Sequence, residues 1–160
     1  MDPKRLALKL VLDTLGVDPS IETIDDRKRV QKAVYLGQLS GVDLGYRFSW
    51  YVMGPYCPAL TRDYYTLAEE LTLDEGAEAA TLRPAVVERL EDIRPLLSPA
   101  EASNLSQENW LELLASYHYL RSVSGQSDVA AAETLTAKKP HISHEAPLAR
   151  AALEAAGLIA

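Results

Sequence analysis

The sequence has few of the residues on which covalent cross-links and metal sites depend. Its 160 residues contain one cysteine, Cys57, and three histidines. A single cysteine excludes a disulfide within the chain and is typical of proteins from a reducing compartment. A zinc site is also disfavoured, because His141 and His144 have only one carboxylate beside them, Glu145, and no further cysteine. We therefore expect no metal and no cofactor.

Long hydrophobic runs and phosphate-binding glycine loops are also missing from the sequence. No stretch is long and apolar enough to span a membrane, and the apolar segment from Leu6 to Leu15 is interrupted by a lysine and an aspartate. This segment lacks the small-residue cleavage site of a signal peptide. The glycines at positions 37, 41 and 45 match no nucleotide-binding loop. These absences predict a cytoplasmic protein without a membrane partner.

Basic residues are outnumbered by acidic ones, 16 against 23, and the net charge is −7. The excess is uneven. Residues 1–50 hold eight basic and seven acidic side chains, residues 51–105 four and ten, and residues 106–160 four and six. An acidic middle region disfavours nonspecific binding to nucleic acid. It suits a basic protein partner better, although a solvated acidic surface is the commoner reason for such a distribution.

The hydrophobic pattern predicts a compact single-domain helical fold over residues 1–160, mainly α (α+β with a small β element). Asp25 or Asp26 is expected to cap the second helix, and Ser143 the last. The polar segment that precedes the fourth helix is predicted to be a loop or to hold a short strand at 79–82. Helical periodicity extends over residues 3–15, 27–40, 58–71, 84–97, 107–123, 128–137 and 143–156.

Aromatic residues are concentrated in one part of the chain. Six of the eight tyrosines and one of the two tryptophans lie between Tyr35 and Tyr65. From Leu44 to Met53 aromatic and polar residues alternate, which predicts a strand with one face inward. Gly54-Pro55 is expected to break this strand and reverse the chain before a helix that begins at Pro58.

Large aromatic side chains from three predicted elements are expected to share one core. Tyr35 lies on the helix predicted at 27–40, whose second half is apolar nearly all round, and Trp110 lies on the apolar face of a later helix. Trp50 belongs to the aromatic strand. We therefore predict that Tyr35, Trp50 and Trp110 pack together.

Six short segments of the sequence form a recognisable pattern. They are RVQKAVYL at 29–36, GYRF at 45–48, YVMGPYC at 51–57, LELLASYHYL at 111–120, KPHIS at 139–143 and GLI at 157–159. This pattern is similar to the YwgA-like uncharacterised bacterial proteins and, more distantly, to the Panacea (SocA-like) antitoxin domain. The likeness covers about residues 25–160, with Arg29-Val30 in place of Lys-Leu, Met53 in place of an aromatic residue and Cys57 in place of the usual serine. The resemblance implies a non-enzymatic interaction module of antitoxin or adaptor type that binds a partner protein. For an antitoxin this partner would be its toxin.

The Gly54-Pro55 corner has two interpretations. Glycine and proline there serve the backbone geometry of a turn, over which Tyr51 and Tyr56 pack. Alternatively, the corner is a partly exposed aromatic site for a partner protein. In this second interpretation the partner-binding residues are Lys32, Arg47, Tyr51, Gly54, Pro55 and Tyr56.

Two further functions remain open beside the favoured interaction module. The predicted helices at 128–137 and 143–156 have the outline of a helix-turn-helix, which would make the protein a nucleic-acid-binding regulator; the last helix, however, has few basic residues. An enzyme centred on Cys57, Tyr56 and His118 is the other alternative, although no catalytic pair stands at a recognisable spacing. We expect no catalytic residue. The oligomeric state stays open.

Overall fold

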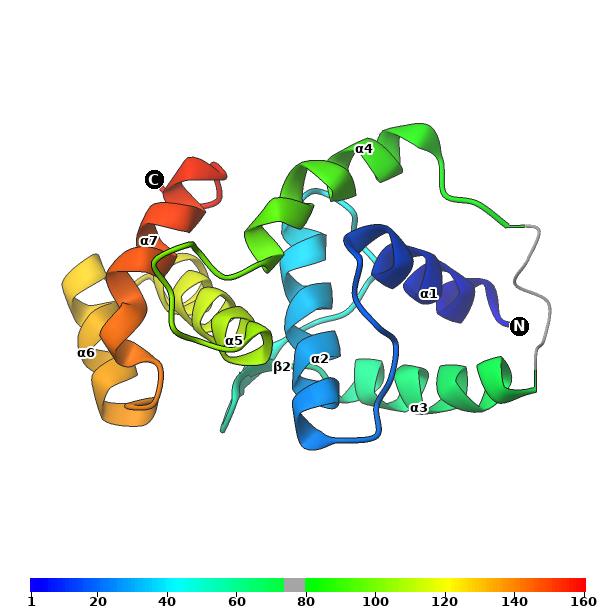
Figure 1. Ribbon diagram of the computed structural model, residues 1–160, viewed down its shortest axis with the longest axis horizontal. Helices are drawn as coiled ribbons and strands as arrows, with labels where there is room; N and C mark the ends of the chain where they lie inside the picture. The colour runs from blue at the N-terminus through cyan, green and yellow to red at the C-terminus, as the bar shows by residue number, and fades with distance from the viewer. Residues whose placement is uncertain (74–79) are drawn as a thin grey trace.

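The computed structural model describes residues 1–73 and 80–160 and shows a mainly α protein with a small β element (Figure 1). Within these residues the chain forms seven α-helices and one two-stranded antiparallel sheet. The sequence predicted the mainly α fold and one aromatic strand, but not the second strand of the sheet. The helices are α1 (Pro3–Leu15), α2 (Ile24–Leu39), α3 (Pro58–Thr72), α4 (Pro84–Ile93), α5 (Gln107–His118), α6 (Asp128–Lys138) and α7 (Ala146–Ala155).

Shorter elements extend or connect these helices. The 3₁₀ helix η1 (Arg94–Leu97) continues α4, and the π-helical turn η2 (Tyr119–Val123) continues α5. The 3₁₀ turn η3 (Ser143–Glu145) leads into α7. Strands β1 (Ser49–Tyr51) and β2 (Gly54–Tyr56) form a hairpin. No helix of the described residues is long and apolar enough to cross a membrane.

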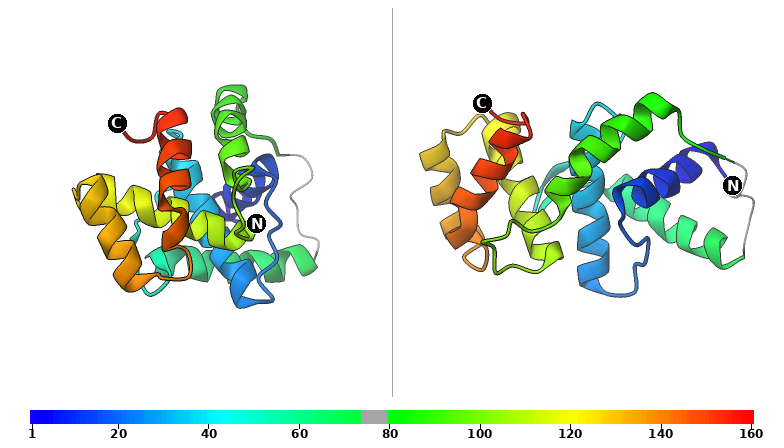
Figure 2. Two further views of the ribbon diagram at one scale, coloured as in Figure 1. Left: turned by 60° about the vertical axis from the view of Figure 1, so that its left-hand side comes forward. Right: turned by 45° about the horizontal axis from the view of Figure 1, so that its top comes forward.

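Helices α2 and α5 form the centre of the molecule. They pack against each other, with α1, α3 and α4 on one side of the pair and α6 and α7 on the other (Figures 1 and 2). Every residue from Val30 to Gly37 and from Trp110 to His118 is buried. Helices buried all round bring their polar side chains into the interior, where each needs a hydrogen-bond partner. Tyr35 and Trp110 lie in this core, and Trp50 is half-buried against it.

Helix starts differ from the prediction at two places. The cap of α2 is Thr23, not Asp25 or Asp26: its hydroxyl accepts the Asp26 N–H, and the Asp26 carboxylate accepts the Thr23 N–H. This reciprocal pair is a capping box, in which the acidic residue occupies the third helical position. Ser143 does not cap α7 but begins η3, and α7 starts at Ala146, with a proline in its first turn.

The aromatic strand is shorter than the predicted Leu44–Met53. Strand β1 covers only residues 49–51, because the backbone before it has no neighbouring strand: the N–H groups of Leu44 and Tyr46 both donate to the side-chain oxygen of Gln38 on α2. The predicted short strand at 79–82 is also absent where the chain is described, at residues 80–82, and residues 74–79 lie outside the described part.

The chain reverses earlier than predicted. Tyr51 pairs with Gly54, so the two residues of the hairpin turn are Val52 and Met53, and Gly54-Pro55 forms the return strand. Val52 is 89% exposed, and the alternation of buried and exposed side chains ends there. The hairpin therefore presents two apolar residues at its tip.

Candidate functional site

A cluster of charged side chains is buried between α2, α5 and the segment after α6. At its centre is Glu112, which is 1% exposed. Its Oε1 accepts hydrogen bonds from Lys28 at 3.0 Å and His141 at 3.2 Å, and its Oε2 from Lys139 at 3.0 Å. Burial favours the neutral acid, but the hydrogen bond and charge of Lys139 and the charge of Lys28 outweigh it and lower the pKa of Glu112. The carboxylate is therefore ionised at neutral pH.

Two buried lysines of this region hold the hairpin. Lys32 Nζ donates to the carbonyl oxygen of Pro55 at 2.5 Å, and Lys139 Nζ donates to that of Val52, also at 2.5 Å. Burial lowers the pKa of Lys32 to about 7; Glu112 opposes this shift, and the charges of Lys139 and Lys28 add to it. The hairpin is thus tied to α2 and to the chain after α6 through its backbone.

The hairpin also lies directly on α5. A Cβ added to Gly54, which has a φ of +89°, would lie 2.4 Å from Ser116 Oγ. No side chain fits at this point, so glycine is required both by the left-handed backbone and by the approach of the helix. The position of the hairpin over the charged cluster therefore depends on this residue.

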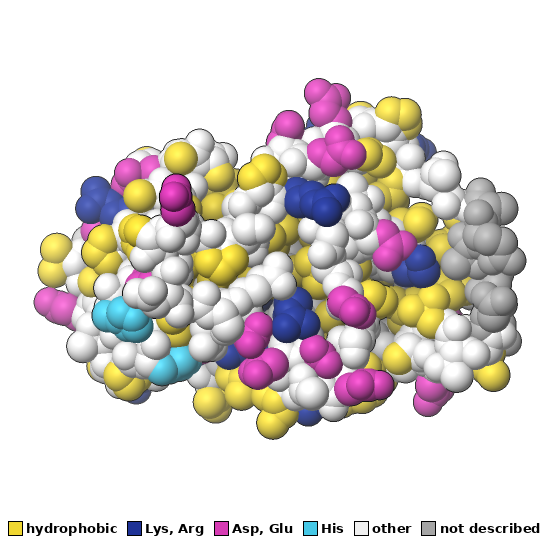
Figure 3. All heavy atoms as spheres, in the orientation of Figure 1, with side chains coloured by type: hydrophobic (Ala, Val, Ile, Leu, Met, Phe, Trp, Pro, Cys, Tyr) yellow, Lys and Arg dark blue, Asp and Glu magenta, His cyan; other side chains and the backbone are white. Residues whose placement is uncertain are grey.

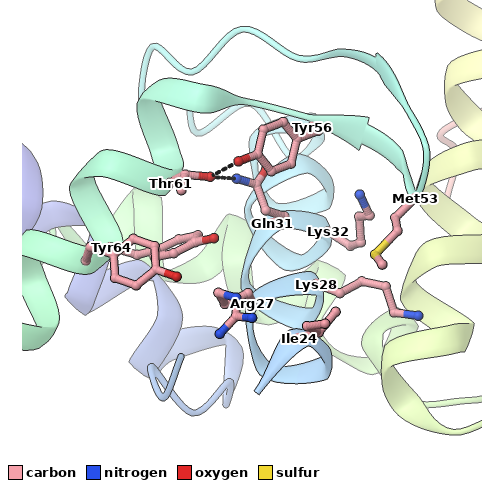
Figure 4. A pocket seen from close by; sticks show the side chains of 10 residues that line it. Ile24, Arg27, Lys28, Gln31, Lys32, Met53, Tyr56, Thr61 and Tyr64 are labelled. Atoms are coloured by element: carbon pink, nitrogen blue, oxygen red, sulfur yellow. Dashed lines mark hydrogen bonds between the residues drawn. The ribbon is translucent and has the colours of Figure 1, made fainter. Parts of the chain in front are cut away.

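A pocket of about 220 Å³ opens between α2, α3 and the hairpin (Figure 4). Residues of α2 form one wall, Thr61 and two tyrosines of α3 another, and the hairpin closes it above. Its lining combines cationic, hydroxyl and apolar groups. The lining residues are Ile24, Arg27, Lys28, Gln31, Lys32, Met53, Tyr56, Thr61, Tyr64 and Tyr65.

A chain of hydrogen bonds runs from α2 to the pocket. Gln31 is buried and exchanges two bonds with the backbone of Cys57: its Oε1 accepts the N–H at 3.0 Å and its Nε2 donates to the carbonyl at 2.9 Å. Nε2 also donates to Thr61 Oγ1 at 3.0 Å, and Thr61 donates to the Tyr56 hydroxyl at 2.5 Å (Figure 4). These bonds fix the orientation of the Gln31 amide and hold Tyr56 over the pocket.

Exposed apolar side chains gather around this pocket. Of the eight large hydrophobic residues that are exposed in the described part of the chain, five lie at the hairpin tip or on the pocket rim, and we call these five the hairpin surface. Single exposed apolar residues are ordinary, but several in one place mark an interaction site. The hairpin surface consists of Ile24 (59% exposed), Tyr51 (49%), Val52 (89%), Met53 (40%) and Tyr65 (47%).

The structure brings together five of the six residues predicted to bind a partner. Lys32 and Tyr56 line the pocket, Gly54 and Pro55 are buried in the hairpin, and the ring of Tyr51 lies 5.2 Å from that of Tyr56. The sixth, Arg47, lies apart: it is exposed, forms an ion pair with an aspartate of its own loop and lines a different pocket.

Sequence reasoning missed Glu112, Lys139 and the apolar hairpin tip. A signal for Glu112 was present, because it is the one carboxylate on the apolar face of the helix predicted at 107–123 that follows Trp110, and a buried carboxylate has to find a cation. Lys139 entered the sequence analysis only as the first residue of the KPHIS motif. Its burial depends on contacts with residues about 27 and 87 positions away, Glu112 and Val52.

The residues of the enzyme alternative are separated. His118 is buried, its Nδ1 lies 2.7 Å from the Tyr35 hydroxyl, and burial lowers its pKa to about 4. Together they line a pocket of about 370 Å³ that does not include Cys57 or Tyr56. Cys57 is buried at the start of α3, and its side chain makes no cap hydrogen bond there. The described residues also hold no group of three or more His, Cys, Asp or Glu side chains placed to bind a metal.

Helices α6 and α7 form a second charged centre around Asp128. Its carboxylate accepts hydrogen bonds from Tyr117 and Arg121, and Arg150 of α7 lies 3.3 Å from its other oxygen. Arg150 also donates to Glu154 at 2.8 Å. Arg150 is the one lysine or arginine of α7, and both of its acidic neighbours are on the helix pair itself.

Comparisons of the chain with models of known families, with curated proteins and with solved structures found no match in any of the three. The resemblance to the YwgA-like and Panacea families stays a prediction from the sequence motifs.

Proposed function

We propose that this protein is a non-enzymatic interaction module that binds a partner protein through the hairpin surface and the pocket beside it. The supporting observation is the gathering of five exposed apolar residues at one place, three of which, Ile24, Met53 and Tyr65, line the pocket. An apolar patch next to a concave site with polar groups is typical of a protein-binding surface. The family resemblance implies that the module is an antitoxin or an adaptor. The partner of an antitoxin would be a toxin.

The hairpin is suited to this role because its backbone is held while its tip is exposed. Lys32 and Lys139 bind the carbonyls of Pro55 and Val52, and Gly54 packs on α5. The side chains of Val52 and Met53 are therefore presented by a fixed backbone. A preorganised surface loses less conformational entropy on binding than a loose loop.

The nucleic-acid alternative is less well supported. DNA contact by α7 would need cations that are free to meet phosphates. Arg150 is instead paired with Asp128 and Glu154. On the face that Figure 3 shows, basic side chains are interspersed with acidic ones and do not form an extended basic area. We therefore keep the interaction module as the proposed function.

Site-specific cross-linking tests this proposal, and the chain offers an unusually clean design for it. Its single cysteine, Cys57, is buried, so a Val52→Cys variant carries one exposed thiol for a photoreactive cross-linker. Val129→Cys is the matched control, since Val129 is 69% exposed on α6, outside the hairpin surface. We expect one protein from the cells of origin to cross-link from position 52 and not from position 129.

Purified partner then gives the quantitative test. Val52→Asp should weaken binding at least about tenfold, or about 1.4 kcal/mol, because a charge is placed in an apolar contact. Its melting temperature should stay unchanged, since the side chain is already in water. Val129→Asp should leave the affinity as it is. Equal effects of the two variants, or cross-linking to the same proteins from both positions, would contradict the proposal.

A further inference from the structure

The pocket beside the hairpin has an unbalanced charge. Three of its ten described lining residues are cations, Arg27, Lys28 and Lys32, and none is Asp or Glu. All three come from α2 and lie along one wall of the pocket (Figure 4). This cationic wall stands out in a protein with a net charge of −7. From this geometry, and resting on the proposed function, we propose that the pocket receives a carboxylate side chain of the bound partner, whose binding segment is therefore acidic as well as apolar.

Two of the pocket cations, Arg27 and Lys32, form no ion pair within the described part of the protein. Arg27 Nη1 donates to two backbone carbonyls, those of Ile21 and Glu22. Lys32 is 1% exposed, and its amine donates to one neutral acceptor, the Pro55 carbonyl. The ammonium form has three donors and the neutral amine two, so in either form at least one donor is left in a nearly water-free position.

Lys28 shares its carboxylate with other cations. It donates to Asn109 and to Glu112, which also binds Lys139 and His141. One carboxylate thus serves the three lysines of this region. Buried charge without a counter-ion is costly. An anion in the pocket would lower this cost. Burial is the main cause of the lowered pKa of Lys32; Glu112 opposes the shift, and the charges of Lys139 and Lys28 add to it.

The hydrogen-bond chain from Gln31 through Thr61 to Tyr56 supplies a hydroxyl donor to the same pocket. Gln31 Nε2 donates to Thr61, and Thr61 donates to Tyr56. The Tyr56 hydroxyl therefore accepts the Thr61 proton and keeps its own proton for a ligand. A carboxylate accepts several hydrogen bonds at once and matches a site that combines Arg27, an amine and a hydroxyl.

The occupant is a protein side chain because of the size and rim of the pocket. A volume of about 220 Å³ holds a group of side-chain size. Ile24, Met53 and Tyr65 on the lining are suited to the apolar neighbours of an Asp or Glu in an extended segment. Apolar contact supplies affinity and the buried carboxylate supplies selectivity, as in other interfaces that combine both.

Selection of random peptides displayed on phage against the purified protein tests this inference before any partner is known. We expect the selected peptides to contain Asp or Glu next to an aliphatic or aromatic residue. Exchange of that residue for Asn or Gln in a synthetic copy of the peptide should weaken binding about tenfold, which corresponds to about 1.4 kcal/mol. The affinity of the acidic peptide should also fall as salt is raised, more than that of the amide peptide.

Paired variants assign the effect to the pocket. Arg27→Gln should lower the affinity for the acidic peptide about tenfold and change the affinity for the amide peptide little. Tyr56→Phe should have the same effect to a smaller extent. The matched controls are Arg62→Gln, a charge removed from α3 outside the pocket lining, and Tyr119→Phe, a hydroxyl removed elsewhere. Both controls should leave both peptides unaffected. Melting temperatures measured on every variant separate lost binding from lost folding.

The outcomes distinguish this inference from the proposed function. Peptides that depend on Val52 but show no preference for Asp or Glu would overturn the carboxylate pocket and leave the interaction surface standing. Acidic peptides that lose affinity equally with Arg27→Gln and Arg62→Gln would also overturn it, because attraction would then come from general charge. A failure of Val52→Asp to affect any selected peptide would instead contradict the proposed surface.

Discussion

The molecule contains two charged centres with the same plan and different surroundings. Glu112 on α5 meets Lys28, Lys139 and His141, and Asp128 on α6 meets Tyr117, Arg121 and Arg150. The side chain of Glu112 is 2% exposed, whereas that of Asp128 is 30% exposed. One carboxylate binds several partners in both places, but only the carboxylate of Asp128 is open enough for water to complete its solvation.

The difference explains why one centre is the candidate site and the other is not. Around Asp128 the excess cation, Arg150, has a second carboxylate, Glu154, and is half exposed. Near Glu112, Lys32 is 1% exposed and the side chain of Lys28 is 8% exposed, and both line the pocket. Paired or hydrated charges cost little and carry no information about a ligand, whereas buried cations in excess of their carboxylates indicate where an anion belongs.

Removal of the central carboxylate gives the largest expected difference between the two centres. Glu112→Gln leaves buried lysines without a counter-ion and should lower the free energy of unfolding by about 3–5 kcal/mol. Asp128→Asn acts on a partly exposed group and should lower it by about 1 kcal/mol or less. Urea unfolding of both variants checks this. Equal losses would show that burial does not distinguish the centres.

The packing of the hairpin on the buried centre gives the next largest effect. Gly45 and Gly54 both have left-handed backbones, with φ of +83° and +89°, but only Gly54 faces Ser116 at close range. Gly45→Ala should lower the free energy of unfolding by about 1 kcal/mol, because alanine disfavours the left-handed backbone. Gly54→Ala should cost about 1–3 kcal/mol more, because the methyl group overlaps the serine.

A second substitution shows whether the overlap is the cause. When Ser116→Gly is introduced into the Gly54→Ala variant, it removes the hydroxymethyl group that the new methyl group overlaps, and part of the lost stability should return. Ser116→Gly alone should destabilise α5, because glycine is a poor helix former. Thermal unfolding of the two single variants and the double variant measures this coupling. Strictly additive losses would place the strain elsewhere.

The pH dependence of stability gives a smaller effect. The pKa of Lys32 is about 7 in the folded protein, against an ordinary value of 10.5. Between these values the unfolded chain binds more protons than the folded one, so the contribution of Lys32 to stability increases as the pH rises. From pH 7 to pH 9 this contribution is about 2 kcal/mol, at 1.36 kcal/mol for each pH unit.

The variant Lys32→Met should lack this increase, and comparison of urea unfolding at the two pH values measures it. The groups whose charges act on Lys32 are Glu112, Lys139 and Lys28. The arginines around Asp128 stay protonated at both pH values and therefore do not contribute to the change of stability with pH. A wild-type protein whose stability falls between pH 7 and pH 9, with no difference from Lys32→Met, would contradict the lowered pKa.

Local signals in the sequence were sufficient for most helices. The bounds of α1 and the start of α3 at Pro58 were predicted, and Ser106 precedes α5 as its cap, because glycine, proline and capping side chains act on their own neighbours. The caps of α2 and α7 were assigned wrongly. In α2 two acidic residues stood near the start, and the competing hydroxyl of Thr23 was the better-placed acceptor.

The hairpin shows where local reasoning fails. The alternation of aromatic and polar residues predicted a strand that begins at Leu44. A strand needs a neighbouring strand, however, and the backbones of Leu44 and Tyr46 bond to the side chain of Gln38 instead. The reversal was predicted at Gly54-Pro55 because glycine and proline favour turns. Packing against Ser116 and the bond of Lys32 to Pro55 place these two residues in the return strand.

The sequence by itself determined the fold class, the positions of the helices and the neighbourhood of Tyr51, Gly54, Pro55 and Tyr56, because these follow from periodicity, capping and turn residues close together in the chain. Tertiary structure alone decided that Lys28 and Lys139 share the carboxylate of Glu112 and that Val52 and Met53 are exposed beside a cationic pocket. The partners in these contacts are 27 to 87 residues apart, and which charges become buried together depends on how α2 packs on α5, which no local pattern encodes.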